Sequence, residues 1–78
     1  MKTIYQDEYR QLIDVLITAR KQQNLTQDEV AKQLHKPQSY IAKIENFERK
    51  LDVLEFVALC RVLGLTPSQV LMMIEQIS

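Results

Sequence analysis

The sequence predicts an all-α fold of five helices, and three observations support this prediction. A helix-capping signal occurs three times, and apolar residues recur at helical spacing between the signals. The 78 residues include one glycine and two prolines, which argues against a turn-rich β protein, and no strand pattern is left over. A chain of this length is expected to form one small domain over residues 1–78.

The first helix is predicted over residues 6–23, where apolar residues form a stripe at helical spacing. The stripe consists of Tyr9, Leu12, Ile13, Leu16 and Ile17. Arg20 falls near the middle of the stripe, where an unpaired cation would be costly to bury. We therefore expect Arg20 to have a carboxylate partner.

The three capping signals mark the starts of the second, fourth and fifth helices. They read LTQDEV at residues 25–30, LDVLEF at 51–56 and LTPSQV at 65–70. In each signal the oxygen of Thr or Asp can accept the amide of the third helical residue, whose own side chain can reach back. The flanking apolar pairs stand where a hydrophobic staple closes. Pro67 suits the first helical position because it loses no intrahelical hydrogen bond there.

These starts place four further helices along the chain. The second helix is predicted over residues 27–34, a turn follows at 35–36, and Pro37 begins the third helix. Residues expected to be buried in the second helix are Val30, Ala31 and Leu34. The fourth helix is predicted over residues 53–63, and Gly64 is placed to end it. Its apolar residues are Leu54, Val57, Ala58, Cys60 and Leu63. The fifth helix is expected to run from Pro67 to about residue 77, with apolar residues at Val70, Leu71, Met72, Met73, Ile74 and Ile77.

The third helix, within PQSYIAKIEN at residues 37–46, has an unusual polar face. On a helical wheel, Ile41 and Ile44 point one way, and small or hydrogen-bonding residues point the other. The second group consists of Ser39, Ala42, Lys43 and Asn46, with Gln38 at its N-terminal edge. Groups of this kind suit the major groove of DNA, and the alternative is a merely solvated helix face.

Positive charge is concentrated around this helix, although the formal net charge of the chain is zero. Residues 32–50 hold five bases against two acids, which is a local charge of +3. The segments before and after it carry −1 and −2 by the same count. The zero net charge discourages a nucleic-acid partner, whereas the distribution of charge favours one.

Five residues fall at the spacing of a helix-turn-helix, in which the second helix docks on the first. They are Gln27, Ala31, His35, Ile41 and Ile44. Together with TQDEVA at 26–31, SYIAKIEN at 39–46 and LDVLEF at 51–56, they resemble the Cro/lambda-repressor-like (XRE-type) helix-turn-helix family from about residue 20 to 70. The resemblance implies a five-helix lambda-repressor-like DNA-binding domain whose second and third helices form the helix-turn-helix, at about residues 27–46.

The resemblance also implies roles for individual residues. Gln38, Ser39 and Lys43 match base-reading positions, where Lys43 would donate to guanine and Gln38 would pair with adenine. Gln27 matches a glutamine that clamps a DNA phosphate. Other residues expected at the DNA backbone are Tyr40, Asn46, Arg49 and Lys50. The alternatives are an ordinary exposed glutamine for Gln27, half-buried packing for Tyr40, and solvated charge or polarity for the other three.

Two further features follow from the resemblance. Arg20 and Glu45 match a salt bridge between the first and third helices, which agrees with the partner that Arg20 requires. His35 and Phe47 stand where glycine is frequent in the family, and a bulky residue in the left-handed region is strained. We expect Phe47 to pack over the loop or toward a dimer mate. His35 has no neighbouring Cys or His at metal-ligand spacing, so we expect a turn residue and no metal.

The fifth helix bears more apolar surface than one small core needs. Because family members pair across palindromic sites, we expect a homodimer through Leu71, Met72 and Ile74, with completion of the core as the alternative. The expected function is a small repressor that binds double-stranded DNA at a palindromic operator. The alternatives are an antitoxin or regulator that binds another protein through this helix, and a domain that has lost its affinity for DNA.

Several classes of protein are not expected from this sequence. There is no Ser/His/Asp or Cys/His arrangement and no glycine-rich phosphate loop, so we expect neither an enzyme nor a cofactor. No apolar run approaches the length of a membrane span, and the first residues lack a signal core. The single cysteine, Cys60, cannot form an intrachain disulfide. A cytoplasmic location is therefore expected.

Overall fold

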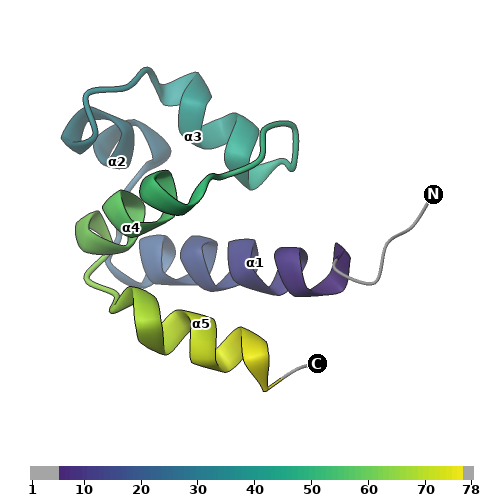
Figure 1. The fold of residues 1–78 in the computed structure, drawn as a ribbon. Helices are drawn as coiled ribbons and strands as arrows, with labels where there is room; N and C mark the ends of the chain where they lie inside the picture. The colour runs from purple at the N-terminus through teal and green to yellow at the C-terminus, as the bar shows by residue number, and fades with distance from the viewer. Residues whose placement is uncertain (1–5, 77–78) are drawn as a thin grey trace.

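A computed structural model describes residues 6–76, and these residues form five helices (Figure 1). The helices are α1 (Gln6–Gln22), α2 (Gln27–Gln33), α3 (Gln38–Glu45), α4 (Val53–Val62) and α5 (Pro67–Glu75). No strand occurs within residues 6–76, so the predicted all-α fold is confirmed. The predicted helix ends agree to within about two residues, and Ile77 lies outside the described part of the chain.

The helices pack around α1, which has α5 on one side and the other three helices on the other side (Figure 1). Helix α1 contacts α3 and α5, α2 contacts α3 and α4, and α4 contacts α5. The most extensive contact joins α2 and α3, which are the two helices of the predicted helix-turn-helix. No single helix within residues 6–76 is long and apolar enough to cross a membrane. Helices α4 and α5 reach that length and composition only together, across a bend of 115°.

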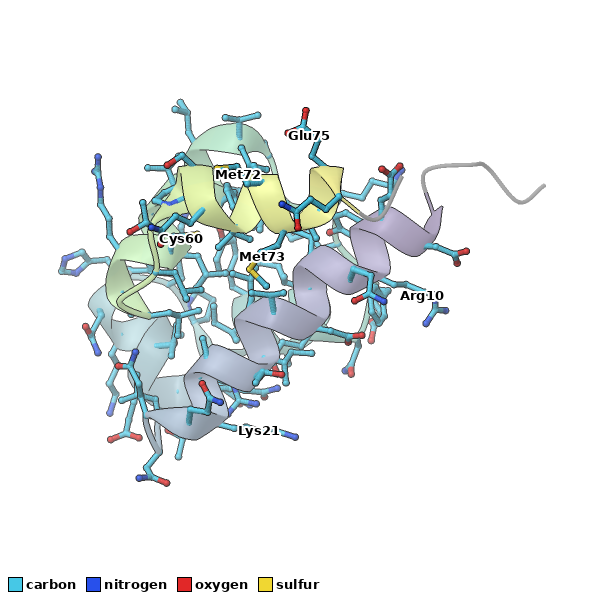
Figure 2. The ribbon with its side chains drawn as sticks, turned by 90° about the horizontal axis from the view of Figure 1, so that it is seen from below. Arg10, Lys21, Cys60, Met72, Met73 and Glu75 are labelled. Atoms are coloured by element: carbon cyan, nitrogen blue, oxygen red, sulfur yellow. The ribbon has the colours of Figure 1, made fainter. Side chains whose placement is uncertain are left out.

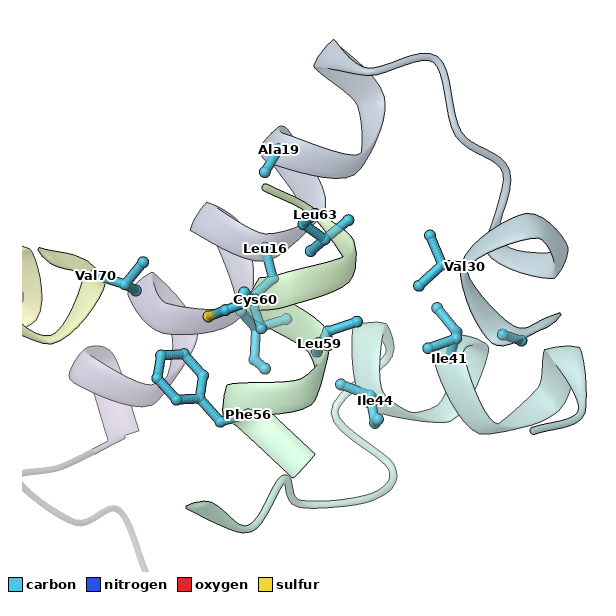
Figure 3. Close-up of a cluster of buried hydrophobic side chains, with 12 residues drawn as sticks. Leu16, Ala19, Val30, Ile41, Ile44, Phe56, Leu59, Cys60, Leu63 and Val70 are labelled. Atoms are coloured by element: carbon cyan, nitrogen blue, oxygen red, sulfur yellow. The ribbon is translucent and has the colours of Figure 1, made fainter. Parts of the chain in front are cut away.

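All five helices contribute to one hydrophobic core (Figure 3). Its buried residues are Ile13, Leu16, Ala19, Val30, Ala31, Ile41, Ile44, Phe56, Leu59, Cys60, Leu63 and Val70. The thiol of Cys60 is completely buried, and this burial raises its pKa. Helix α4 buries the stripe that includes Phe56 and Leu59, so Leu54 on its other side is 79% exposed. Leu34, which was expected to be buried, is half-buried.

Two of the three predicted capping boxes are present. Thr26 Oγ1 accepts the Glu29 amide at 3.0 Å, and Asp52 Oδ1 accepts the Glu55 amide at 2.8 Å. The two glutamates reach back to the cap amides at 2.8 and 3.0 Å. The third prediction was wrong, because the Thr66 side chain makes no cap hydrogen bond. The amide of Gln69 donates at 3.0 Å to the backbone carbonyl of Thr66 instead.

Each of the first four helices is followed, two residues after its last helical residue, by a residue in the left-handed conformation. These residues are Asn24, His35, Phe47 and Gly64, with φ of 58°, 58°, 63° and 72°. In every case the next amide donates to the carbonyl five residues earlier, which is the hydrogen bond of a Schellman motif. These bonds join Leu25 to Arg20, Lys36 to Ala31, Glu48 to Lys43 and Leu65 to Cys60, at 3.1, 2.9, 2.8 and 2.8 Å. The left-handed backbone expected at His35 and Phe47 is therefore present.

Phe47 packs against α1. Its ring meets that of Tyr9 edge-on, with centroids 6.3 Å apart, and the guanidinium of Arg10 lies 4.9 Å from the ring centroid. The Tyr9 hydroxyl accepts a hydrogen bond from the Leu51 amide at 3.1 Å, at the far end of the same loop. The α3–α4 loop is thus anchored to α1 at both of its ends, which offsets the strain at Phe47.

Candidate nucleic-acid interface

The two faces of α3 have the environments that the helical wheel predicts. Ile41 and Ile44 are only 2% and 1% exposed, and they dock the helix on the core. Ser39 and Lys43 are exposed on the other side, and Ala42 between them is half-buried. The outward face therefore presents a hydroxyl and an amine from a rigid helix. The other two polar groups of the predicted surface, Gln38 and Asn46, are also exposed.

An ion pair between Arg20 of α1 and Glu45 of α3 fixes the C-terminal end of α3. Arg20 Nε donates to Glu45 Oε2 at 2.7 Å, and Nη2 donates to Oε1 at 3.0 Å. Arg20 Nη1 donates to the Leu25 carbonyl at 2.9 Å. The two side chains are only 13% and 12% exposed. The partner expected for Arg20 is therefore present, in the bidentate geometry that arginine and carboxylate favour.

A chain of hydrogen bonds continues from this ion pair to the surface. Gln27 Nε2 donates to Glu45 Oε1 at 2.8 Å, and Gln38 Nε2 donates to Gln27 Oε1 at 2.9 Å. Gln27 begins α2 and is half-buried, whereas Gln38 begins α3 and is exposed. The structure thus joins two residues whose expected roles differ, phosphate binding and base reading. Both amides are positioned before any ligand arrives.

A second polar cluster surrounds Glu55 in the first turn of α4. Arg49 Nη1 and Nη2 donate to Glu55 Oε1 and Oε2 at 3.0 and 2.8 Å. The Arg49 guanidinium also lies 4.9 Å from the ring centroid of Tyr40, and Lys36 Nζ lies 5.3 Å from the same centroid. Sequence reasoning identified Glu55 only as a capping residue. Its pairing with Arg49 spans a loop, so no helical spacing indicates it.

The pKa values of this cluster follow from its contacts. The pKa of Glu55 is lowered from 4.5 to about 2, chiefly by the hydrogen bond from Arg49 and then by the Asp52 amide. The pKa of Tyr40 is raised to about 12, first by burial and then by its hydrogen bond to Glu55. Both groups therefore keep one protonation state across neutral pH, with the carboxylate charged and the phenol neutral.

This lowered pKa predicts an acid-dependent loss of stability. Because the folded pKa of Glu55 lies below its ordinary value of 4.5, its contribution is complete above pH 4.5 and disappears as the pH falls toward 2. The free energy of unfolding should be measured between these pH values for the wild type and for Glu55→Gln. The difference between the two proteins should shrink as the pH falls. Parallel curves would show that Glu55 is not specifically stabilised in its charged form.

The cations of the interface fall into two groups. Lys32 pairs with Asp28 at 3.2 Å, four residues away on α2, and Arg49 pairs with Glu55 at 2.8 Å. The side chains of Lys36, Lys43 and Lys50 are exposed. Part of the local positive charge is therefore offset within the protein. No group of three His, Cys, Asp or Glu residues within residues 6–76 is arranged to hold a metal ion.

Helix α5 lies on the opposite side of α1 from α3 (Figure 1), and several of its large apolar side chains are exposed. Leu71 and Met72 are 53% and 56% exposed, whereas Ile74 is half-buried. Met73 lies on the side of α5 that faces α1 (Figure 2), and there it lines a groove of about 400 Å³. Other residues of this groove include Gln11, Asp14, Thr18, Gln22 and Gln69. Leu71 and Met72 are thus accessible to a partner, and Ile74 contributes less exposed apolar surface than expected.

Comparisons with known proteins agree with this geometry. A family model described as helix-turn-helix matches residues 16–70. The solved structure of an XRE-family like protein from Pseudomonas syringae pv. tomato str. DC3000 is similar to this chain, with 41% sequence identity and a TM-score of 0.92. The match covers 96% of this chain and 92% of that chain. The search of curated proteins gave no match.

Proposed function

This chain belongs to the XRE-type helix-turn-helix family, and from that premise we propose that it is a repressor that binds a palindromic operator as a homodimer. Membership makes it a DNA-binding transcription regulator whose ligand is double-stranded DNA. The observation that carries the proposed reading of DNA bases is the orientation of α3. It buries Ile41 and Ile44 and presents Ser39 and Lys43 to solvent.

In this proposal α3 enters the major groove and reads bases. The amine of Lys43 donates to guanine O6 or N7, and the Ser39 hydroxyl donates or accepts as the base requires. Gln38 presents an amide that can pair with adenine. Its hydrogen bond to Gln27, at 2.9 Å, limits the orientations of that amide and so favours one base over the others.

Residues of α2, of α3 and of the α3–α4 loop hold the DNA backbone in this proposal. Gln27 lies at the N-terminus of α2, where its amide and the helix amides can bind one phosphate. Asn46 and Lys50 are exposed in the loop that follows α3, which suits phosphate contacts there. Tyr40 is half-buried, so only an edge of its side chain is available. Arg49 is already paired with Glu55, which limits its contribution.

The homodimer is proposed to form through α5. Two reading helices related by a twofold axis can enter successive major grooves, about one helical turn apart. Leu71 and Met72 supply exposed apolar surface for the contact, and Ile74 supports them from its half-buried position. Methionine adapts its shape to a facing surface, which suits a self-complementary interface.

Selection of bound sequences from random duplex DNA tests the function and the reading residue together. We expect the wild type to enrich a palindrome, and Lys43→Ala to lose preference at one position of each half-site, at a cost of about 1–3 kcal/mol. Lys50→Ala is the matched control. Its loss of a phosphate contact should weaken all sequences alike and lower the salt slope by about 1. Enrichment of no sequence by the wild type would contradict the proposal.

A second candidate function uses α5 to bind another protein, as an antitoxin binds its toxin. The exposed Leu71 and Met72 favour it, because an apolar helix face serves a foreign partner as well as a second copy. Salt dependence separates the two functions. Binding to DNA through several phosphates weakens steeply as salt rises, whereas binding through an apolar interface hardly changes.

A further inference from the structure

We propose that Glu55 holds the guanidinium of Arg49 within the protein and thereby weakens the binding of the α3–α4 loop to DNA phosphates. The inference rests on the proposed function, because it concerns the affinity of the same DNA-binding surface. It assigns to an acidic residue of α4 a role in setting the strength of non-specific binding. Glu55 would restrain Arg49 in the free protein without itself contacting a base.

Arg49 makes several contacts within the protein, although its side chain is 42% exposed. Its two terminal nitrogens donate to the two oxygens of Glu55 at 3.0 and 2.8 Å, in the bidentate geometry that arginine also uses for phosphate. Arg49 Nη1 donates in addition to the Lys50 carbonyl at 3.2 Å. The guanidinium carbon also lies 4.9 Å from the centroid of the Tyr40 ring. A phosphate that uses the same edge must first displace the carboxylate.

Glu55 is itself held in place, so the restraint is persistent. Its Oε1 accepts the Asp52 amide at 3.0 Å in the capping box of α4, and its side chain is only 19% exposed. The low pKa of Glu55, about 2, keeps it charged at every pH near neutrality. Protonation therefore does not release Arg49 under ordinary conditions. A competing anion is required.

The electrostatic consequence concerns DNA directly. A cation that is paired with a carboxylate attracts a nearby phosphate weakly, because the two charges nearly cancel beyond a few ångströms. The adjacent Lys50 is exposed. The loop thus presents one available cation where its sequence contains two. Weaker phosphate binding lowers the affinity for non-specific DNA. Base contacts then supply a larger share of the binding free energy, which favours the operator over other sequences.

Glu55→Gln tests the proposal, since glutamine also suits the third position of a capping box. Affinity for a mixed-sequence DNA duplex should be measured by fluorescence anisotropy at salt concentrations between about 50 and 200 mM. We expect the variant to bind about 3–10 times more tightly than the wild type at the low-salt end. The slope of log affinity against log salt should become steeper by about 0.9. Thermal melting establishes that the variant is folded.

Two controls make the result specific. Asp14→Asn removes the same charge from the groove between α1 and α5, and it should change affinity much less than Glu55→Gln. In a background of Arg49→Gln, the gain in DNA affinity from Glu55→Gln should disappear, because the guanidinium that Glu55 restrains is absent. Equal or weaker binding by folded Glu55→Gln would overturn the inference, and so would a gain that survives Arg49→Gln. Absence of DNA binding by the wild type and by all variants would overturn the proposed function itself.

Discussion

Replacement of Arg20 with alanine is expected to lower the free energy of unfolding by about 3–5 kcal/mol. The substitution leaves Glu45, which is only 12% exposed, without its cation, and it leaves the Leu25 carbonyl without its donor. Gln27 remains as a neutral donor to Glu45 at 2.8 Å and cannot compensate a charge. The loss is large because removal of one partner leaves an uncompensated charge in a nearly buried site.

Denaturant titration followed by circular dichroism measures this change, with the midpoint and slope of each transition compared to the wild type. The matched control removes both charges, as Arg20→Met with Glu45→Met, and should recover most of the lost stability. A cost below about 1 kcal/mol for Arg20→Ala would mean that the pair behaves as an exposed salt bridge. It would also remove the support that we assign to α3.

Replacement of Met72 with aspartate is expected to dissociate the proposed homodimer and to weaken operator binding by about 100-fold or more. Met72 is 56% exposed on α5, so the substitution leaves the core intact and places a carboxylate in the proposed interface. Burial of an unpaired charge in an apolar contact is unfavourable. A monomer binds each half-site separately and loses the advantage of two linked contacts.

Light scattering after size-exclusion chromatography measures the oligomeric state, and the selected palindrome serves as the DNA probe. Leu54→Asp is the matched control, because it makes the same kind of change at a residue that is 79% exposed on α4. It should leave the oligomeric state unchanged. Retention of the dimer by Met72→Asp, or dissociation by Leu54→Asp, would place the contact elsewhere. A monomeric wild type would exclude the homodimer.

Much of the fold was predictable because its signals are local. The capping boxes at Thr26 and Asp52 and the apolar spacing of α1 and α3 are properties of short segments, and the structure confirms them. The requirement of Arg20 for an acid also followed from its place on a buried stripe. The error at Thr66 came from treating all three signals alike. At this helix start the backbone carbonyl of Thr66, and not its side chain, accepts a hydrogen bond from the amide of Gln69.

The candidate site was predictable in part. The helical wheel placed Ser39 and Lys43 outward, and the structure agrees. The contacts between Gln27 and Gln38 and between Arg49 and Glu55 were not predicted, because they depend on how two helices or a loop and a helix meet. The exposure of Leu54 was also not predicted, because only packing decides which side of an apolar helix is covered. The roles of these residues toward DNA remain predictions.

The completely buried thiol of Cys60 gives this protein an internal probe of its own opening. The sequence contains one cysteine, so a thiol reagent has a single target. Its burial and raised pKa both suppress reaction in the native state. The rate of labelling therefore reports how often the helices separate enough to admit the reagent. A ligand that binds the native state slows this labelling rate. The effects of operator DNA, of a second subunit and of a toxin on stability can therefore be compared through the labelling rate of Cys60.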